Sequence, residues 1–228
     1  MALTVPPQHI EHIKKFLALP DDKIEAFLDA LAKAGPQFNF SDLSDEVSGR
    51  TGLSRDLTRD IVLVLTSLYL TRDAQNAPVE KFVDQEVSVA LKRAETFSGD
   101  DADVQWAKFR KFIITALSLE STVGTAAKAG RILTQHERIF ASARILTDVR
   151  PIFHLNVSEK PDSAVIIHML RITQRDNFGH MSDKYFALDS NDIRNLKALI
   201  DRALRKEETL KALVKDSGVT VLYPKDYF

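Results

Sequence analysis

Cysteine is absent from the 228 residues, which excludes disulfide frameworks, thiol catalysis, iron–sulfur clusters and cysteine-bound zinc. Glycine and proline are scarce, at eight each, so collagen-like and low-complexity chains are excluded as well. Neither sign of charge dominates, because the net charge is −1. Hydrophobic residues make up 44% of the chain, enough to fill a core, and the length suits one large domain or two small ones.

A long hydrophobic run is missing too. The most apolar stretch, Ile61 to Leu70, is interrupted by Thr66 and Ser67 and has about half the length of a membrane-spanning helix. We therefore expect a core helix there and no membrane partner. The segment Met1 to Pro20 lacks the basic start and apolar run of a targeting peptide, so we expect a cytoplasmic protein.

Residues 1–135 carry apolar side chains at helical spacing and are predicted to form a helical region. Gly35-Pro36 ends one predicted helix, Gly52 breaks another, and Ser54 caps the helix that follows. The small, polar and acidic stretch 98–103 is a candidate linker inside this region.

The spacing changes around Ile139. Ile139 to Asn156 is rich in β-branched and aromatic residues, and Ser163 to Thr173 is apolar at both odd and even positions, as expected for a strand buried on both faces. Gln174 to His180 has the Asp, Asn and Gly of a hairpin loop, and Lys184 to Leu188 supplies the returning strand. An antiparallel sheet is therefore predicted here.

A long C-terminal helix is predicted after the sheet. Asp189 and Asp192 have the spacing of a helix cap and its third-position partner, and an apolar stripe continues over Asn191 to Lys215. Val219 to Tyr223 is predicted to add a short edge strand. The predicted fold class is α+β, with a helical region over residues 1–135 and, over residues 136–228, a small antiparallel sheet packed on a long C-terminal helix.

Two segments resemble known families. The run Leu43 to Leu65, LSDEVSGRTGLSRDLTRDIVLVL, resembles the N-terminal helical hairpin of HU-type bacterial histone-like proteins, best at the turn Thr51 to Ser54. In that family the hairpin mainly builds the dimer and a β-arm grips DNA. No basic arm follows here, so the resemblance implies a helical hairpin and does not imply DNA binding.

The C-terminal part resembles the COMM domain. The resemblance lies in the order of two strands, then Tyr185-Phe186-Ala187-Leu188, then a helix over Asn191 to Leu210. A COMM domain is a small sheet covered by one helix; it follows a helical N-terminal domain and pairs with a second copy. The resemblance implies a dimerising adaptor with no catalytic residues to transfer.

Motifs for catalysis are absent. The sequence has no Gly-x-Ser-x-Gly, and Gly124 to Gly130, GTAAKAG, lacks the preceding strand and the Gly-Lys-Ser/Thr ending of a phosphate loop. Acidic pairs such as Asp21-Asp22 and Glu207-Glu208 lie at predicted helix ends or exposed positions, where capping and solubility explain them. We therefore predict no catalytic, cofactor-binding or metal-binding residues and no cofactor, and we favour a non-enzymatic role.

Histidines offer two weaker alternatives. His9 and His12 are three residues apart on a predicted helix, close enough to share a metal if another ligand completes the shell, but surface histidines are the favoured interpretation. His154 and His168 lie in the first two predicted strands, where they face each other if the register allows. A hydrogen-bonded pair is favoured there over an acid–base pair, and an enzyme with an unrecognised site stays a second alternative.

Basic residues concentrate in the segment 108–150, which has eight Lys and Arg against Glu120, Glu137 and Asp148. This excess motivates a nucleic-acid-associated protein as the first alternative function. A recognition helix over Ser54 to Leu70 is disfavoured, because Ile61 to Leu65 is apolar around most of the helix and Asp56 and Asp60 offset Arg55 and Arg59.

The favoured function is a non-enzymatic interaction or regulatory protein that self-associates, with a homodimer expected. Arginines among and before the predicted strands form the candidate interaction surface, since a strand edge flanked by arginines suits an acidic partner or a second copy of the sheet. These residues are Arg131, Arg138, Arg144, Arg150 and Arg171.

Overall fold

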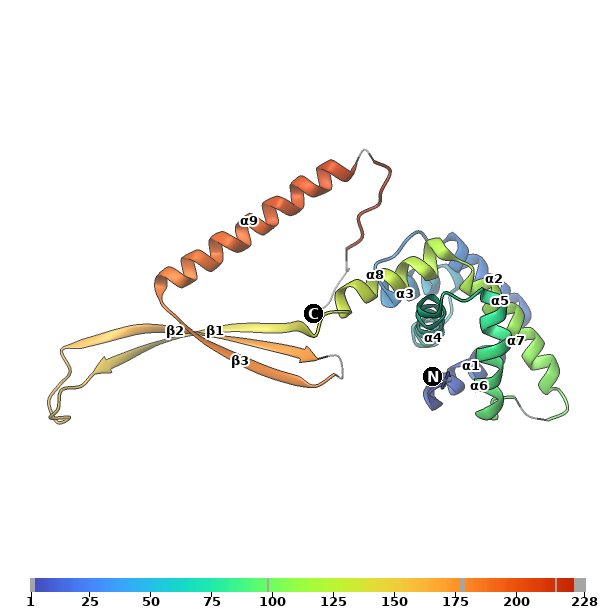
Figure 1. The fold of residues 1–228 in the computed structure, drawn as a ribbon, viewed down its shortest axis with the longest axis horizontal. Coiled ribbons are helices and arrows are strands. Elements are labelled where there is room, and N and C mark those ends of the chain that lie inside the picture. The colour runs from blue at the N-terminus through green and yellow to red at the C-terminus, as the bar shows by residue number, and fades with distance from the viewer. Residues whose placement is uncertain (1–2, 98, 177–178, 216, 224–228) are drawn as a thin grey trace. The chain divides into compact units, whose positions relative to one another are not determined.

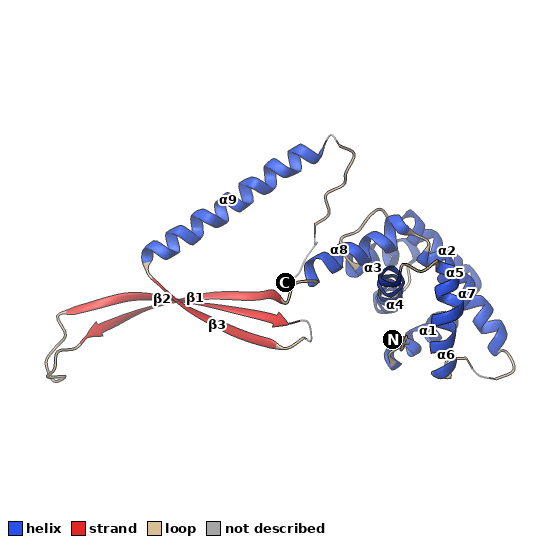
Figure 2. Cartoon of the chain, viewed as in Figure 1, coloured by secondary structure: helices blue, strands red, loops and turns tan. Residues whose placement is uncertain are grey.

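The computed structural model describes residues 3–97, 99–176, 179–215 and 217–223. It divides into two compact units, a helical unit that runs to Ile132 and a sheet unit over Leu133–Val221. Figures 1 and 2 show the helices α1 to α8 of the first unit and the three strands and α9 of the second. The helical unit contains α1 (Pro7–Leu17), α2 (Asp21–Lys33), α3 (Phe40–Thr51), α4 (Arg55–Gln75), α5 (Val79–Phe82), α6 (Ser88–Arg93), α7 (Ala102–Leu117) and most of α8 (Thr125–Thr134).

The core of the helical unit is built around α4 and a phenylalanine cluster. Ile61, Val62, Leu65 and Tyr69 of α4 are fully or almost fully buried, which confirms a core helix at the most apolar stretch of the sequence. Buried aromatic rings from α1, α2 and α7 meet beside it: the ring centroid of Phe16 lies 4.9 Å from that of Phe27 and 4.6 Å from that of Phe112. No helix among the described residues is long and apolar enough to cross a bilayer.

Local signals set the helix boundaries of this unit. Gly52 ends α3 with φ of 67°, a left-handed conformation that favours glycine, and the Ser54 side chain accepts the Leu57 N–H at the start of α4, as predicted. The candidate linker 98–103 is partly outside the described residues at Ser98, and its last two residues, Ala102 and Asp103, already belong to α7. The linker prediction is wrong for those two positions, because they form the first helical turn.

Two π-helical turns interrupt the helices. Val83–Val87 joins α5 to α6, and Glu120–Gly124 precedes α8. Gly124 is required at the second turn, since a Cβ atom there would lie 2.8 Å from the Tyr69 hydroxyl and 2.9 Å from its ring carbon. The small residues of Gly124 to Gly130 thus serve close packing at Gly124, where α4 approaches the turn.

The sheet unit contains three antiparallel strands in the order β1-β2-β3, namely β1 (Arg138–Ile152), β2 (Ser163–Asp176) and β3 (Met181–Leu188). The antiparallel sheet is confirmed, and β3 begins three residues earlier than predicted. The register of β1 against β2 shifts between Phe140 and Ser142. This bulge exchanges the faces on which the side chains before and after it lie.

The long C-terminal helix is confirmed as α9 (Ser190–Lys215). Asp189 accepts the Asp192 N–H at 2.9 Å and its own N–H donates to the Asp192 carboxylate at 3.0 Å, which is the predicted reciprocal cap. The predicted strand over Val219 to Tyr223 is wrong, because these residues have no strand structure. The fold class is α+β, a helical region followed by a small antiparallel sheet and a long C-terminal helix, as predicted. The predicted packing of the sheet on this helix is not seen, because no residue of α9 is buried.

Candidate functional site

Both faces of the sheet carry exposed apolar side chains. Residues paired across strands share a face, so the register assigns each side chain to one of two faces. We call the face with Ile145, Leu170 and Phe186 the apolar face, and the face with Leu146, Met169 and Ala187 the mixed face. Ile145 is 49% exposed although it lies in the middle of β1, and Phe186 of β3 is 47% exposed.

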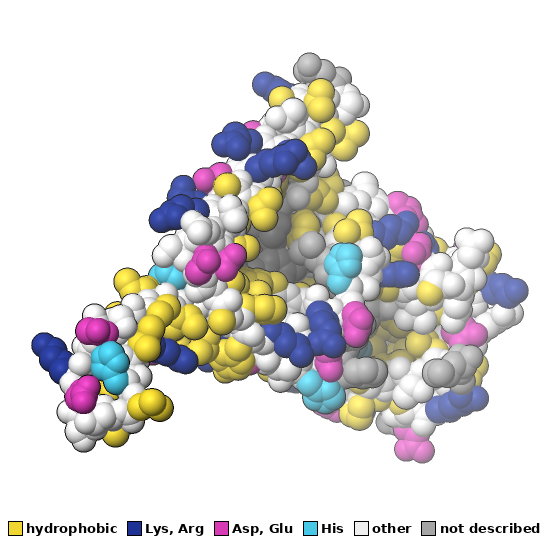
Figure 3. All heavy atoms as spheres, turned by 60° about the vertical axis from the view of Figure 1, so that its left-hand side comes forward, with side chains coloured by type: hydrophobic (Ala, Val, Ile, Leu, Met, Phe, Trp, Pro, Cys, Tyr) yellow, Lys and Arg dark blue, Asp and Glu magenta, His cyan; other side chains and the backbone are white. Residues whose placement is uncertain are grey.

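The apolar stripe of α9 is exposed as well. No residue of α9 is buried, although its side chains form one apolar stripe along the helix. Figure 1 shows why: α9 leaves the end of β3 and extends away from the strands. Figure 3 shows hydrophobic side chains gathered over the strands and on α9. The most exposed members of the stripe are Leu199, Ile200, Leu204, Leu210 and Leu213.

The candidate arginines do not form one surface. Arg131 lies in α8 of the helical unit, whereas the other four lie in the sheet unit. Arg144, Arg150 and Arg171 lie on the mixed face, and Arg138 lies on the apolar face because the bulge intervenes. Sequence spacing alone does not reveal this bulge, and with it the structure brings three of the five arginines onto one face.

Charges on the mixed face are only partly paired. Arg144 lies directly opposite Arg171 in the register, an unfavourable pairing of like charges. Arg171 lies 3.9 Å from the Asp183 carboxylate, and Arg150 lies 3.6 Å from the Asp148 carboxylate. Arg144 has no ion-pair partner within the described part of the chain. The mixed face therefore has an unneutralised cation near the middle of β1.

Three bases in the helical part of the segment 108–150 form ion pairs in the structure. Lys108 pairs with Asp21 at 2.6 Å, Arg110 pairs with Asp84 at 2.6 Å, and Lys128 lies 3.4 Å from Asp73. Hydrogen bonding to Arg110 holds the pKa of the Asp84 carboxyl below its ordinary value. These pairs lower the positive potential that the sequence suggests for the helical part of the segment.

The histidines of the sheet do not face each other, so that prediction is wrong. His168 lies opposite Thr147, and its Nδ1 is 2.8 Å from the threonine hydroxyl oxygen. His154 follows the end of β1, with its Nε2 3.6 Å from Asp162. The strand ends before His154 reaches β2, and neither histidine lines the two cavities found in the helical unit.

His9 and His12 stack loosely on α1, with ring centroids 6.2 Å apart. His12 Nε2 lies 3.2 Å from an Asp60 oxygen, which ties α1 to α4. Burial, followed by the neighbouring His12, lowers the pKa of His9. His9 also borders a cavity of about 270 Å³ lined mainly by apolar side chains such as Leu68. No group of three metal-binding side chains is found among the residues that the structure describes.

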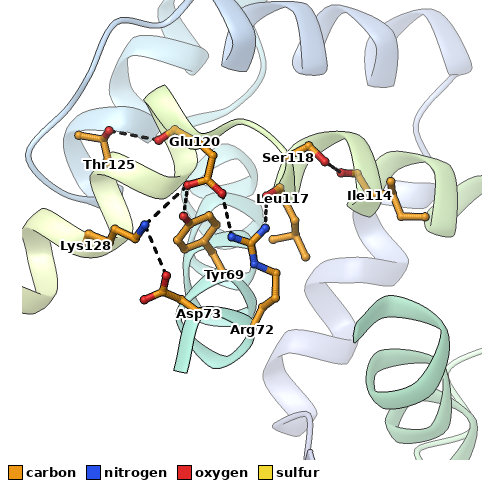
Figure 4. Close-up of polar contacts among 9 residues, drawn as sticks. All are labelled: Tyr69, Arg72, Asp73, Ile114, Leu117, Ser118, Glu120, Thr125 and Lys128. Atoms are coloured by element: carbon orange, nitrogen blue, oxygen red, sulfur yellow. Dashed lines mark hydrogen bonds and ion pairs between the residues drawn. The ribbon is translucent and has the colours of Figure 1, made fainter. Parts of the chain in front are cut away.

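A polar cluster around Tyr69 links α4 to the π-helical turn before α8 (Figure 4). The Tyr69 hydroxyl donates to the Glu120 carboxylate, and Arg72 donates to Glu120 at 2.8 Å and to the Leu117 carbonyl at 3.1 Å. Lys128 lies 3.7 Å from Glu120 on the other side. Sequence reasoning missed this cluster; the only local signal is a tyrosine and an arginine three residues apart in an apolar helix.

The cluster around Tyr69 has a structural role, because it holds α4 against the turn Glu120–Gly124. Burial raises the pKa of Tyr69, and the hydrogen bond to Glu120 adds to that rise. Burial opposes ionisation of Glu120, but hydrogen bonds from Arg72 and Tyr69 outweigh it, so the pKa of the carboxyl lies below its ordinary value of 4.5. The ionised carboxylate thus compensates the nearly buried Arg72 guanidinium.

We expect the Glu120→Gln variant to lose about 1–2 kcal/mol of unfolding free energy at pH 7, because Arg72 then lacks its charged acceptor. A lowered pKa in the folded state stabilises the protein above the ordinary pKa, and this contribution is lost as the pH falls through the lowered value. The difference between wild type and variant should therefore shrink in acid. Urea unfolding followed by Trp106 fluorescence measures it, and a difference that stays constant down to pH 3 would argue against a role for the charge.

No family model matches this chain, and no curated protein matches it.

Proposed function

We propose that the protein is a non-enzymatic interaction protein that self-associates through its sheet unit. The observation that carries this proposal is the exposure of apolar side chains on both sheet faces and along α9, in a unit where α9 has no buried residue. A contiguous exposed apolar surface of this kind is typical of protein interfaces. A second copy brings the same apolar surfaces and so offers a cover for them.

Two further observations support the proposal that a partner protein, and not solvent, covers the sheet and α9. The strands contain apolar residues at both odd and even positions, which is the composition of a sheet covered on both sides. An isolated helix in water is marginal when it lacks tertiary packing, yet α9 is 26 residues long and has a complete N-terminal cap. Packing against a second copy would provide the missing burial for both elements.

Nucleic-acid binding by the segment 108–150 is the alternative, and the structure gives it less support. At least five of the eight bases in that segment lie within 4.0 Å of a carboxylate, which lowers the positive potential that they offer to phosphates. The bases also belong to α7, α8 and β1, which are elements of two separate units. Sedimentation equilibrium of the wild-type chain with added duplex DNA or single-stranded RNA tests this alternative directly.

We expect Ile145→Asp to weaken self-association about 100-fold, because each copy would lose an apolar contact and would bury a charge. The matched control is Val104→Asp, which places the same charge on a side chain that is 70% exposed in the helical unit. Sedimentation equilibrium over a range of concentrations measures the dissociation constant of the dimer for both variants. Equal behaviour of the two variants, or a complex with nucleic acid that dissociates in high salt, would contradict the proposal.

A further inference from the structure

β1 is an open edge of the sheet. Its only strand neighbour is β2, so one side of its 15-residue backbone has no partner strand within the described residues. A long edge strand with apolar side chains is a ready template for pairing with another strand. The identity of that strand follows from the hydrogen-bond direction, the register and the charges of β1.

The Val149 N–H points to the open edge. It donates to the carboxylate of the preceding residue, Asp148, at 2.8 Å. Asp176 of β2 donates its N–H to the His180 carbonyl on the β3 side, so even-numbered residues of β2 point to β3. Val149 lies opposite Ile166 and therefore points away from β2.

Backbone groups in an antiparallel pair alternate between the two sides of a strand, so the N–H groups of Ile145 and Thr147 point to the same edge. Pro151 has no N–H to offer, which ends the usable edge at that residue. At the N-terminal end of β1, the bulge before Ser142 marks the other limit of the usable edge.

The charged residues of β1 are spaced so that two antiparallel copies of the strand can place opposite charges side by side. If a two-fold axis passes through Leu146, the antiparallel copy of β1 places its Asp148 opposite Arg144, twice in the dimer. Arg144 is the cation that lacks a partner and faces Arg171, so this arrangement places a carboxylate opposite it; the same Asp148 carboxylate also lies 3.6 Å from Arg150 of its own copy. Ala143 then meets Val149 of the other copy, and Ile145 meets Thr147.

Other positions of the two-fold axis along β1 give less favourable pairings. An axis through Thr147 places Arg144 opposite Arg150, which repels. An axis through Ile145 places Arg144 opposite Leu146 and leaves the charge unpaired. An axis through Val149 brings Pro151 into the ladder opposite Thr147, where a donor is needed. Of these four axes, only the one at Leu146 places Arg144 opposite a carboxylate and keeps Pro151 outside the paired segment 142–150.

We propose that β1 pairs antiparallel with β1 of a second copy about an axis at Leu146, which joins the two sheets into one of six strands. This inference rests on the proposed self-association and specifies its geometry. The joined sheet places the two apolar faces edge to edge. The exposed surface around Ile145 then becomes one continuous apolar surface on which the α9 helices can pack.

Single-cysteine variants test the geometry, because the natural chain has no cysteine. Leu146 would oppose its own copy in a pair without backbone hydrogen bonds, with Cα atoms about 4.5 Å apart, which suits a disulfide. The control is Met169→Cys, next to Leu146 on β2 and on the same face. Its two copies would lie about 14 Å apart across three strand spacings, too far for a disulfide.

A charge exchange provides the second test. Arg144→Asp and Asp148→Arg are each expected to weaken dimerisation about tenfold, and the double variant should restore it to within about threefold of wild type. Mild oxidation should link Leu146→Cys into a covalent dimer and leave Met169→Cys unlinked on a non-reducing gel.

The outcomes separate this inference from the proposed function. A chain that is dimeric by light scattering, but in which Leu146→Cys links no faster than Met169→Cys or the double charge variant stays weak, would overturn edge pairing and leave self-association standing. A monomer at every concentration would overturn both.

Discussion

The Phe16→Ala variant is expected to lose about 3–5 kcal/mol of unfolding free energy, the usual cost of deleting a buried aromatic ring. Phe16 is completely buried and lies within 5 Å of both Phe27 and Phe112 by ring centroid. The cavity left behind would open where α1, α2 and α7 meet. Urea unfolding followed by the fluorescence of Trp106, the single tryptophan, reports on this unit directly.

Val104→Ala is the control for that measurement, because Val104 lies on the same helix as Phe112 but is 70% exposed. It should change the unfolding free energy by less than about 0.5 kcal/mol. A loss below about 1 kcal/mol for Phe16→Ala would mean that the phenylalanine cluster is not the centre of this core.

The double variant Ile200→Asp, Leu210→Asp is expected to weaken self-association about 1000-fold or more, since each copy loses two apolar side chains from the stripe of α9. The released α9 should also lose helix content, because an unpacked helix in water is only marginally stable. Light scattering measures the association, and hydrogen exchange of the α9 amides measures the helix.

The matched control is Ala198→Asp, Thr209→Asp, which adds the same charge to the opposite side of α9. It should leave both the association and the exchange rates close to wild type. If the control dissociates the protein as much as the stripe variant does, the effect would come from charge and the apolar stripe would not be the contact.

Much of the fold follows from local chemistry that the sequence displays. Gly52 and Ser54 place the turn between α3 and α4, because a left-handed residue and a capping hydroxyl act within a few residues of each other. The Asp189 and Asp192 cap depends in the same way on neighbours. Apolar residues at both parities of β2 predict a strand buried on both faces, and this prediction is wrong, because every residue of β2 is half-buried or exposed.

The parts that sequence reasoning missed depend on register and on distant contacts. The bulge between Phe140 and Ser142 moves Arg138 to the opposite face from Arg144, and nothing in the spacing of arginines signals it. His154 and His168 do not meet, because β1 ends at Ile152. Tyr69 and Glu120 are joined across 51 residues, so no local pattern reveals their bond.

The most direct test of self-association is the molar mass of the wild-type chain, measured by light scattering across a range of concentrations. We expect a mass of about 51 kDa, twice the 25.6 kDa of one chain, with a shift toward one chain on dilution. A mass of 25.6 kDa at every concentration would contradict the proposal that a second copy covers the sheet and α9.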